Sequence, residues 1–330
     1  MIVLPAALPP AIFLMGPTAS GKTNVAVELA QRFPVEIISV DSALVFRDMN
    51  IGTAKPDASI LSKAPHQLID IIDPTEAYSA AAFRHDASGL MAEITGRGKI
   101  PLLVGGTMLY FKALRDGLSK LPQANPVIRA ALDAEIALHG IQYLHKQLAL
   151  VDAETAARLS PNDSQRIQRA MEIYRITGHP MSTLIESKSL SIVENEAAGR
   201  NSDEGTLPYQ VTAIALIPSD RAQLHARIAT RFKTMVSLGL PDELRALRNK
   251  YSLLPDMTSM RCVGYRQAWQ YLEGEINHDE LIENGIVATR QLAKRQLTWL
   301  RSTLTDIELD CLDAELVAKV CDALSLRFFT

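Results

Sequence analysis

The sequence predicts an α/β protein in which a parallel sheet carries helices on both faces and an all-helical segment interrupts the chain. Short apolar runs alternate with helical patterns up to about residue 120, whereas residues 127–188 are helical in pattern without a strand-like run. A β-branched apolar run then returns at residues 211–217. Strands that alternate with helices form parallel sheets, because each crossover must pass over a face of the sheet.

The individual elements follow from the same patterns. Strands are predicted at residues 11–15, 35–40, 100–104 and 211–217. Helices of the core are predicted at residues 23–33, 79–95, 221–247 and 280–302. The composition changes at residues 121–126, and the polar stretch 188–207 is typical of a loop. We therefore predict a core formed by residues 1–120 and 208–330, and a helical insertion domain formed by residues 121–207.

The composition excludes several protein classes. With 330 residues, 47% of them hydrophobic, the chain can bury a large core, and its net charge of -3 gives no sign of a nucleic-acid partner. An anion site must then come from local clusters of charge. Cys262, Cys311 and Cys321 form neither a metal pattern nor a disulfide framework, which suits the cytoplasm. No apolar run reaches the roughly 18 residues of a membrane span, so no membrane partner is expected.

A glycine-rich loop is the most specific motif in the chain. Residues 16–23, GPTASGKT, fit the pattern G-x-x-x-x-G-K-[ST] between a predicted strand and a predicted helix. In this loop the backbone amides and the helix N-terminus surround phosphate oxygens, Lys22 adds a charge, and the Thr23 hydroxyl is suited to Mg²⁺. The context predicts a P-loop NTPase-like sheet and a phosphate or diphosphate ligand, and does not identify what the phosphate is attached to.

Two polar residues follow predicted strands at the edge where a doubly wound sheet binds its ligand. Asp41 comes directly after residues 35–40, and Thr107 follows Gly105 and Gly106 after residues 100–104. The position of Asp41 fits three roles, namely a turn-forming residue, a metal ligand or a general base. Thr107 fits a helix N-cap and a ligand contact about equally well.

Basic residues cluster locally in spite of the acidic net charge. Residues 284–305 contain Arg290, Lys294, Arg295 and Arg301 and no acid. At about 100° per residue, Arg290, Lys294 and Arg301 share one helix face. A solvated helix face is the ordinary explanation, but the absence of acids favours contact with phosphate.

Three further basic positions have the same character. Residues 261–266, RCVGYR, combine two arginines with an aromatic ring, as in stacking and phosphate contacts with nucleic acid, although simple packing is also compatible. Arg166 and Arg169 lie three residues apart on a predicted helix, and Arg221 follows the strand at residues 211–217. The position of Arg221 predicts that it faces a diphosphate at the sheet edge.

Taken together, these motifs resemble the tRNA dimethylallyltransferases, also called tRNA isopentenyltransferases, and among them the bacterial, proteobacterial branch. Starting at residues 16, 40, 51, 105, 165, 261 and 294, the motifs are GPTASGKT, VDSAL, IGTAKP, GGTMLY, QRIQR, RCVGYR and KRQLTWLR. They span nearly the whole chain in order, which makes the combination highly specific.

The resemblance implies a reaction and its partners. A dimethylallyl group would move from dimethylallyl diphosphate to N6 of the adenosine immediately 3′ of the anticodon, in tRNAs that read codons beginning with U. The glycine loop would then hold an isoprenoid diphosphate instead of ATP, with Mg²⁺ as cofactor. A monomeric enzyme is expected, with residues 121–207 clamping the anticodon stem-loop and the target base turned out of its stack.

The resemblance and the chemistry together imply roles for individual residues. Asp41 would accept the proton of the amine, and Thr107 would orient the adenosine. The residues expected to stabilise the leaving diphosphate are Gly16, Pro17, Thr18, Ala19, Ser20, Gly21, Lys22, Thr23 and Arg221. Thr23 would also hold the metal. The residues expected to contact tRNA are Asp41, Ser42, Ala43, Leu44, Thr107, Arg129, Gln165, Arg166, Ile167, Gln168, Arg169, Arg261, Cys262, Val263, Gly264, Tyr265, Arg266, Lys294, Arg295, Gln296, Leu297, Thr298, Trp299, Leu300 and Arg301.

The sequence departs from the family pattern at two positions and leaves alternatives open. Phe46 replaces a common Tyr, and Gln67 replaces a usual His or Arg, so a polar contact at either position is in question. A P-loop kinase or ATPase would leave the basic segments unexplained, and an isopentenyltransferase of free adenine nucleotides would not need them. A non-catalytic RNA-binding module would leave the glycine loop unexplained.

Overall fold

A computed structural model describes residues 8–118, 121–185 and 207–328. The chain forms two compact units, one made of Met1–Asp116 with Leu207–Thr330 and the other of Gly117–Thr206. The first unit contains the glycine loop and all six strands, and the second contains helices only over its described residues.

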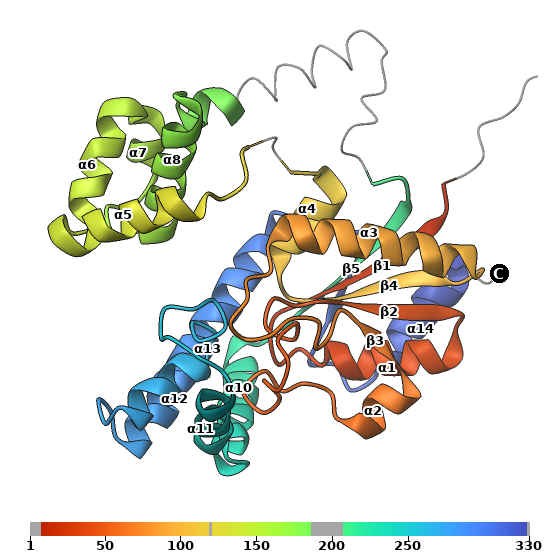
Figure 1. The fold of residues 1–330 in the computed structure, drawn as a ribbon. Helices are drawn as coiled ribbons and strands as arrows, with labels where there is room; N and C mark the ends of the chain where they lie inside the picture. Colours follow the sequence, from red (N-terminus) through yellow and green to blue (C-terminus); the bar gives the residue numbers. More distant parts are fainter. Residues whose placement is uncertain (1–7, 119–120, 186–206, 329–330) are drawn as a thin grey trace, which may run out of the picture. The chain divides into compact units, whose positions relative to one another are not determined.

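A six-stranded parallel sheet forms the centre of the first unit, in the order β3-β2-β4-β1-β5-β6 (Figure 1). The strands are β1 (Pro10–Met15), β2 (Val35–Val40), β3 (His66–Gln67), β4 (Ile100–Gly105), β5 (Gln210–Ile217) and β6 (Ile307–Asp310). The four strands predicted from the sequence are present, and the parallel α/β sheet is confirmed. The two edge strands, β3 and β6, were not predicted because each is too short to show a pattern.

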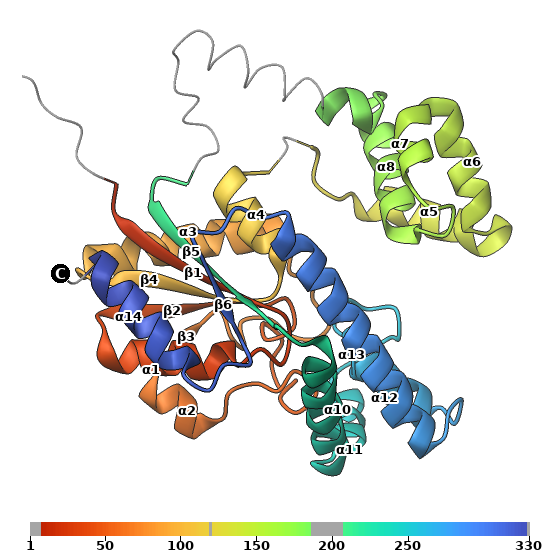
Figure 2. The same ribbon diagram turned by 180° about the vertical axis from the view of Figure 1, so that it is seen from behind.

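Helices cover both faces of the sheet (Figure 2). The face formed by residues such as Phe13 and Leu103 packs against α3 (Ala80–Gly96) and α4 (Met108–Asp116). The face formed by residues such as Ile12 and Leu102 packs against α1 (Lys22–Arg32) and α14 (Leu316–Phe328). Because side chains alternate along each strand, both faces of every central strand are buried, which explains the continuous apolar runs in the sequence.

A bundle of helices with its own core extends the first unit beside the sheet. It contains α10 (Arg221–Ser237), α11 (Leu240–Lys250), α12 (Tyr265–Leu272) and α13 (His278–Arg301). The single helix predicted over residues 221–247 was wrong, because the chain breaks at Gly239, which has a φ of 95°, and restarts with Pro241 in the first turn of α11.

The second unit buries a small apolar core of its own between four helices. These are α5 (Pro126–His139), α6 (Ile141–Val151), α7 (Ala153–Arg158) and α8 (Ser164–Thr177). Asn125, Asp152 and Asp163 cap three of them by accepting hydrogen bonds from the first-turn amides. The predicted loop at residues 188–207 lies outside the described residues except for Leu207.

Candidate active site

The parallel register brings the ends of three strands together at one edge of the sheet. Met15 pairs with Gly105, and Gly105 pairs with Val40. The residues that directly follow these strands are therefore neighbours: the glycine loop after β1, Asp41 after β2 and Thr107 after β4. This meeting of strand ends is the usual ligand edge of an open α/β sheet.

The glycine loop lies between β1 and α1, the context that the motif requires. Lys22 is the first residue of α1, and its Nζ donates to the carbonyl of Pro17 at 2.6 Å and to the Ser20 hydroxyl at 3.3 Å. Burial lowers the pKa of Lys22 to about 8, although the nearby Asp41 carboxylate opposes this effect. The ammonium thus lies inside the loop rather than in bulk solvent, where it is suited to phosphate oxygens.

Gln296 on α13 supports the loop from the other side. Its Oε1 accepts from the backbone amide of Thr18 at 2.8 Å, and its Nε2 donates to the carbonyl of Gly106 at 3.0 Å. A Cβ at Gly106 would lie 2.3 Å from Nε2, so only glycine permits this approach. Gln296 thus links the phosphate loop to the end of β4 by hydrogen bonds, and its contact with tRNA stays a prediction.

The backbone amides of residues 42–44 hold the side chains of Asp41 and Thr107 in place. Asp41 Oδ1 accepts from the amides of Ala43 at 2.8 Å and Leu44 at 3.3 Å, and Thr107 Oγ1 accepts from the amide of Ser42 at 3.0 Å. Within the described ranges, Oδ2 of Asp41 accepts no hydrogen bond. One oxygen therefore fixes the carboxylate, and the other is available to a ligand.

Four ionisable groups lie within electrostatic reach of Asp41. Burial lowers the pKa of the Arg231 guanidinium on α10, and the Asp41 carboxylate raises it. Burial, followed by the charge of Asp41, raises the pKa of Tyr110 and raises that of Cys262 to about 12. Lys22 also interacts with both Asp41 and Arg231. The Asp41 carboxylate thus lies among two cations, a phenol and a thiol drawn from four separate parts of the chain.

The segment at residues 261–266 is divided between the interior and the surface. Gly264 and Tyr265 are buried, whereas Arg261 and Arg266 are exposed. Cys262 and Val263 are partly buried, and Cys262 lies near Asp41 as described. Tyr265 is thus a core residue of the bundle, and only the two arginines present charged side chains to solvent.

Helix α13 shows the same division. Ile286, Ala293, Leu297 and Leu300 are buried, as the helical periodicity predicted. Five polar or aromatic side chains of its last two turns are exposed, namely Lys294, Arg295, Thr298, Trp299 and Arg301, whereas Arg290 and Gln296 are partly buried. The two buried leucines therefore hold the helix in place, and their contact with tRNA stays a prediction.

The exposed cations of these two segments share one further property. Within the described residues, none of them has a carboxylate oxygen within 4.0 Å, in contrast to exposed cations elsewhere such as Lys319 with Asp313. The cations concerned are Arg261, Arg266, Lys294, Arg295 and Arg301. Cations without a carboxylate partner in the protein remain available to phosphate groups of a ligand.

In the second unit, the expected basic residues surround one buried carboxylate. Glu172 on α8 is fully buried and accepts from Arg129 Nε at 2.9 Å and from Arg169 at 2.5 Å. Burial would raise the pKa of Glu172, but the two arginines outweigh it and lower the pKa. Arg129 and Arg169 are therefore fixed in orientation, and Ile167 between them is a core residue rather than a surface contact.

Beside this pair lies a cavity of about 470 Å³. It is lined by Arg158, Leu159, Gln165, Arg166, Arg169 and Met181. Arg166 is exposed and pairs with Asp163, and Gln168 donates to Asp133 at 2.6 Å. The unit thus combines three arginines with an apolar cavity wall.

The structure also indicates residues that the sequence patterns missed. Arg221 lies exposed at the start of α10, at the end of β5 as predicted, but Arg231 is the arginine that interacts with Lys22 and Asp41. The only sequence indication for Arg231 is its place on the helix after β5. Phe46 is fully buried in the bundle core, so the hydroxyl absent at this position leaves a packed apolar side chain.

The described residues lack a membrane-spanning helix and a cluster of metal-ligating side chains. No helix among them is both long and apolar enough to cross a bilayer. Nor do they contain a group of three or more His, Cys, Asp and Glu side chains placed to hold a metal ion.

The chain is similar to known proteins over almost its whole length. The family described as IPP transferase matches residues 44–303, and that described as isopentenyl transferase matches residues 10–71. A tRNA dimethylallyltransferase of Methylobacillus flagellatus is 57% identical, with 96% of each chain covered, and one of Ralstonia pickettii is 58% identical, with 97% of this chain and 96% of that one covered.

Solved structures agree with these relatives. The tRNA isopentenylpyrophosphate transferase of Bacillus halodurans is 34% identical, with a TM-score of 0.67 over 97% of this chain and 96% of that one. A eukaryotic dimethylallyltransferase acting on tRNA is 25% identical, with a TM-score of 0.75 over 97% of this chain and 78% of that one. The identities and the coverage show that the chain belongs to the IPP transferase family.

Proposed function

We propose that this protein transfers the dimethylallyl group of dimethylallyl diphosphate to N6 of the adenosine immediately 3′ of the anticodon, in tRNAs that read codons beginning with U. The observation that carries the proposal is the position of the Asp41 carboxylate within electrostatic reach of Lys22 in the phosphate loop. A proton acceptor beside a diphosphate site is what alkylation of an amine by an allylic diphosphate requires. The relatives named above support the tRNA substrate.

The diphosphate would occupy the loop at residues 16–23. As the C–O bond of the donor breaks, its electron pair goes to the diphosphate, whose negative charge increases. Amides of the loop, the Lys22 ammonium and the Arg231 guanidinium are the groups we propose to stabilise that charge, with Arg221 as a further candidate at the start of α10. Donors fixed before the reaction stabilise developing charge without reorganising, which is usually the largest contribution to catalysis.

Asp41 is the proposed general base. The exocyclic amine is a poor nucleophile, because its lone pair is delocalised into the purine ring. As the N6–C bond forms, the nitrogen loses a proton, which we assign to Oδ2 of Asp41, the oxygen without a hydrogen bond in the described residues. Thr107, bonded to Ser42 beside Asp41, is proposed to orient the adenosine.

The proposal includes Mg²⁺ at Thr23, which lies exposed in the first turn of α1 next to Lys22. A hydroxyl and phosphate oxygens are the hard ligands that Mg²⁺ prefers, and the ion commonly takes most of its ligands from phosphate and water. When bound, Mg²⁺ would neutralise charge on the leaving diphosphate.

RNA binding is assigned to cations of both units. In the first unit these are Arg261, Arg266, Lys294, Arg295 and Arg301, and in the second unit Arg166, Arg169 and Arg129, which we propose clamp the anticodon stem-loop. A monomeric state and a cytoplasmic location remain predictions, to be tested by light scattering and by fractionation.

One experiment separates this function from its alternatives. The protein, Mg²⁺ and labelled dimethylallyl diphosphate are mixed with an anticodon stem-loop, with AMP or, in a third reaction, with ATP. We expect label in the stem-loop alone. Label in AMP would support a free-nucleotide prenyltransferase, which the match of residues 10–71 to the isopentenyl transferase family makes the second candidate. Phosphate release from ATP without transfer would indicate a kinase or ATPase.

The same assay tests the base. Asp41→Asn keeps an oxygen for the amides of Ala43 and Leu44 but removes the proton acceptor. We expect the rate of transfer to fall by about 10²- to 10⁴-fold, with stem-loop binding largely retained. Transfer at the wild-type rate would exclude Asp41 as the base.

A further inference from the structure

Glu243 on α11 makes four hydrogen bonds to two segments that are distant in sequence. Its Oε2 accepts from the backbone amides of Asn50 at 2.9 Å and Ile51 at 2.7 Å. Its Oε1 accepts from the amide of Gly52 at 3.2 Å and from the hydroxyl of Tyr265 at 2.6 Å. A single carboxylate thus holds three successive amides of one loop and the phenol of another segment, and both of its oxygens are used.

The two segments also touch directly beneath this carboxylate. A Cβ at Gly52 would lie 2.4 Å from the ring of Tyr265 and 2.8 Å from Leu240. Tyr265 itself is fully buried. The glycine in the motif IGTAKP therefore permits the Tyr265 ring to pack against the loop backbone, and its phenol to reach Glu243.

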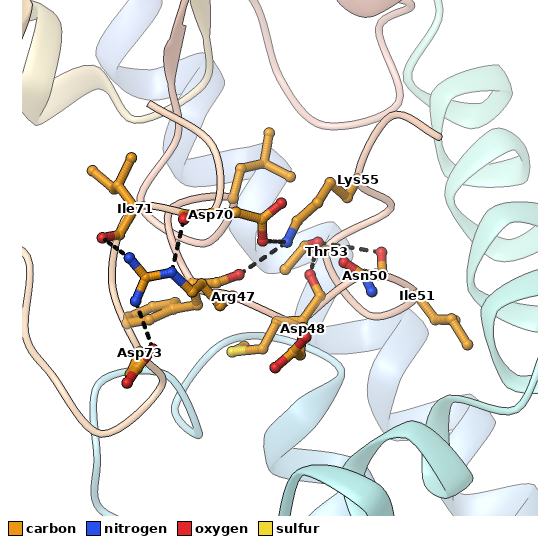
Figure 3. Close-up of polar contacts among 12 residues, drawn as sticks. Arg47, Asp48, Asn50, Ile51, Thr53, Lys55, Asp70, Ile71 and Asp73 are labelled. Carbon is orange, nitrogen blue, oxygen red and sulfur yellow. Dashed lines mark hydrogen bonds and ion pairs between the residues drawn. The ribbon is translucent and has the colours of Figure 1, made fainter. Parts of the chain in front are cut away.

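The other end of the loop is fixed independently, as Figure 3 shows. Arg47 donates to the carbonyls of Asp70 at 3.1 Å and Ile71 at 2.8 Å and pairs with Asp73 at 2.7 Å. The nearly buried Lys55 pairs with Asp70 and donates to the carbonyl of Phe46 at 2.9 Å. These contacts anchor residues 46–55 to the segment after β3, and Asp48 in the same stretch pairs with Lys250 at the end of α11 at 2.6 Å.

The segments that Glu243 joins lead to opposite sides of the candidate active site. The loop continues the chain that starts at Asp41, and Tyr265 lies between Arg261 and Arg266 in the segment whose Cys262 lies within electrostatic reach of Asp41. Glu243 is not among the charged groups that change the pKa of Lys22 or of Arg231, the two cations near Asp41. Its influence on the site is therefore exerted through the two segments.

We propose that Glu243 is a positioning residue for the RNA substrate. It fixes the Asp41 loop and the arginine segment at residues 261–266 in one relative position, so that the adenosine reaches Asp41 when the backbone of its RNA binds Arg261 and Arg266. This inference rests on the proposed function. The donor site, held from the other side by Gln296, does not depend on Glu243.

Two variants test the proposal without removing the packing. Glu243→Gln keeps the shape of the side chain, but its NH₂ group faces amide or hydroxyl donors at one of the two oxygen positions. Tyr265→Phe removes only the phenol from the network. As a matched control, Asp306→Asn changes a carboxylate that accepts from the amide of Ala213 in β5 at 2.7 Å.

The first readout is hydrogen exchange of the amides of residues 50–52. We expect exchange about 10-fold faster or more in Glu243→Gln and no change there in Asp306→Asn. The second readout is the kinetics of transfer to an anticodon stem-loop. We expect kcat/KM for the stem-loop to fall by about 10- to 100-fold in Glu243→Gln and less in Tyr265→Phe, with an unchanged Kd for dimethylallyl diphosphate.

Three results would overturn the inference. One is wild-type kcat/KM for the stem-loop in Glu243→Gln despite faster exchange at residues 50–52, since the loop would then be irrelevant to the reaction. Another is an equal loss in Asp306→Asn at the same Tm, which would reduce the role of Glu243 to general stability. The third is a wild-type protein that transfers nothing to the stem-loop, which would overturn the proposed function as well.

Discussion

Gln296 is hydrogen-bonded directly to Thr18, although they lie 278 positions apart in the sequence. Its amide oxygen accepts from the Thr18 backbone N–H, and its amide nitrogen donates to the Gly106 carbonyl. The conformation of the phosphate loop is therefore set partly by α13, a helix whose exposed side carries the cations proposed to bind RNA. Helix α13 thus has two roles, because it supports the phosphate loop and carries these cations.

Gln296→Ala should weaken use of the donor. The substitution removes both hydrogen bonds and leaves the Thr18 amide without its acceptor, whereas the Gly106 carbonyl keeps the Met108 amide at 3.1 Å. An unsatisfied amide costs about 1–3 kcal/mol, which corresponds to about a 10- to 100-fold loss in kcat/KM for dimethylallyl diphosphate. Gln296→Glu should be worse, because its second oxygen meets the Gly106 carbonyl and its charge opposes the diphosphate. Steady-state kinetics with varied donor check both, with exposed Gln291→Ala on the same helix as the control.

We expect the binding of the donor to depend on pH through the charge of Lys22. Because the pKa is lowered to about 8, the ammonium is present below that pH and is lost as the pH rises through it. The Kd for dimethylallyl diphosphate, measured by calorimetry, should therefore increase above about pH 8. Lys22→Arg keeps its charge over this range, so its Kd should show no such inflection. A wild-type Kd that follows the same curve as the arginine variant would contradict the assignment.

The lowered pKa of Lys22 should also make the folded protein more stable as the pH rises, although donor binding becomes weaker. An unfolded lysine titrates near its ordinary pKa of 10.5, so between about pH 8 and 10.5 the unfolded chain binds more protons at Lys22 than the folded chain. The contribution of this group to the free energy of unfolding should therefore rise by roughly 3 kcal/mol as the pH increases across that window. Lys22→Met should raise the Tm at pH 7 while abolishing transfer, and should lose this pH dependence. Differential scanning calorimetry measures both.

How far the sequence could predict the structure depended on whether the evidence was local. The strands β1, β2, β4 and β5 are buried on both faces and appear as continuous apolar runs, which made them predictable. The edge strands β3 and β6 contain two and four residues, too few to produce a period. At Gly239, the helical periodicity continued through a turn, so α10 and α11 appeared to be one helix.

The same distinction applies to the candidate site. The glycine loop was predictable because strand, glycines, lysine and helix are consecutive. Asp41 and Thr107 followed from their positions after strands. Arg231 and Glu243 act through contacts with Lys22, Asp41 and the loop at residues 50–52, which only the folding of the helical bundle against the sheet creates. No spacing in the sequence distinguishes them from other charged residues on amphipathic helices.

Arg231 and Arg221 predict different results for diphosphate binding. Arg231 interacts with both Asp41 and Lys22, so Arg231→Ala should lower kcat by about 10²-fold, the usual cost of removing a donor to developing charge. Arg221 is not among the charged groups that act on Lys22, so Arg221→Ala should have a smaller effect. The inhibition constant of inorganic diphosphate provides the matching binding measurement, with exposed Lys233→Ala on the same helix as the control. Equal effects of the two arginine variants would mean that both cations contact the diphosphate.

Lys294 predicts a salt dependence of RNA binding. It lies exposed on α13 without a carboxylate within 4.0 Å in the described residues, so a phosphate that binds it displaces counterions and not a protein partner. Lys294→Ala should weaken stem-loop binding and reduce the slope of log K against log salt by about 1, at all stem-loop sequences alike. Lys319→Ala removes an exposed lysine that pairs with Asp313 on the other face of the sheet, and it should leave the slope unchanged. Fluorescence anisotropy over a salt series measures both slopes. The loss of a phosphate contact changes the slope, whereas a general loss of stability changes only the fraction of folded protein. A weaker affinity with an unchanged slope would therefore exclude Lys294 from the phosphate contacts.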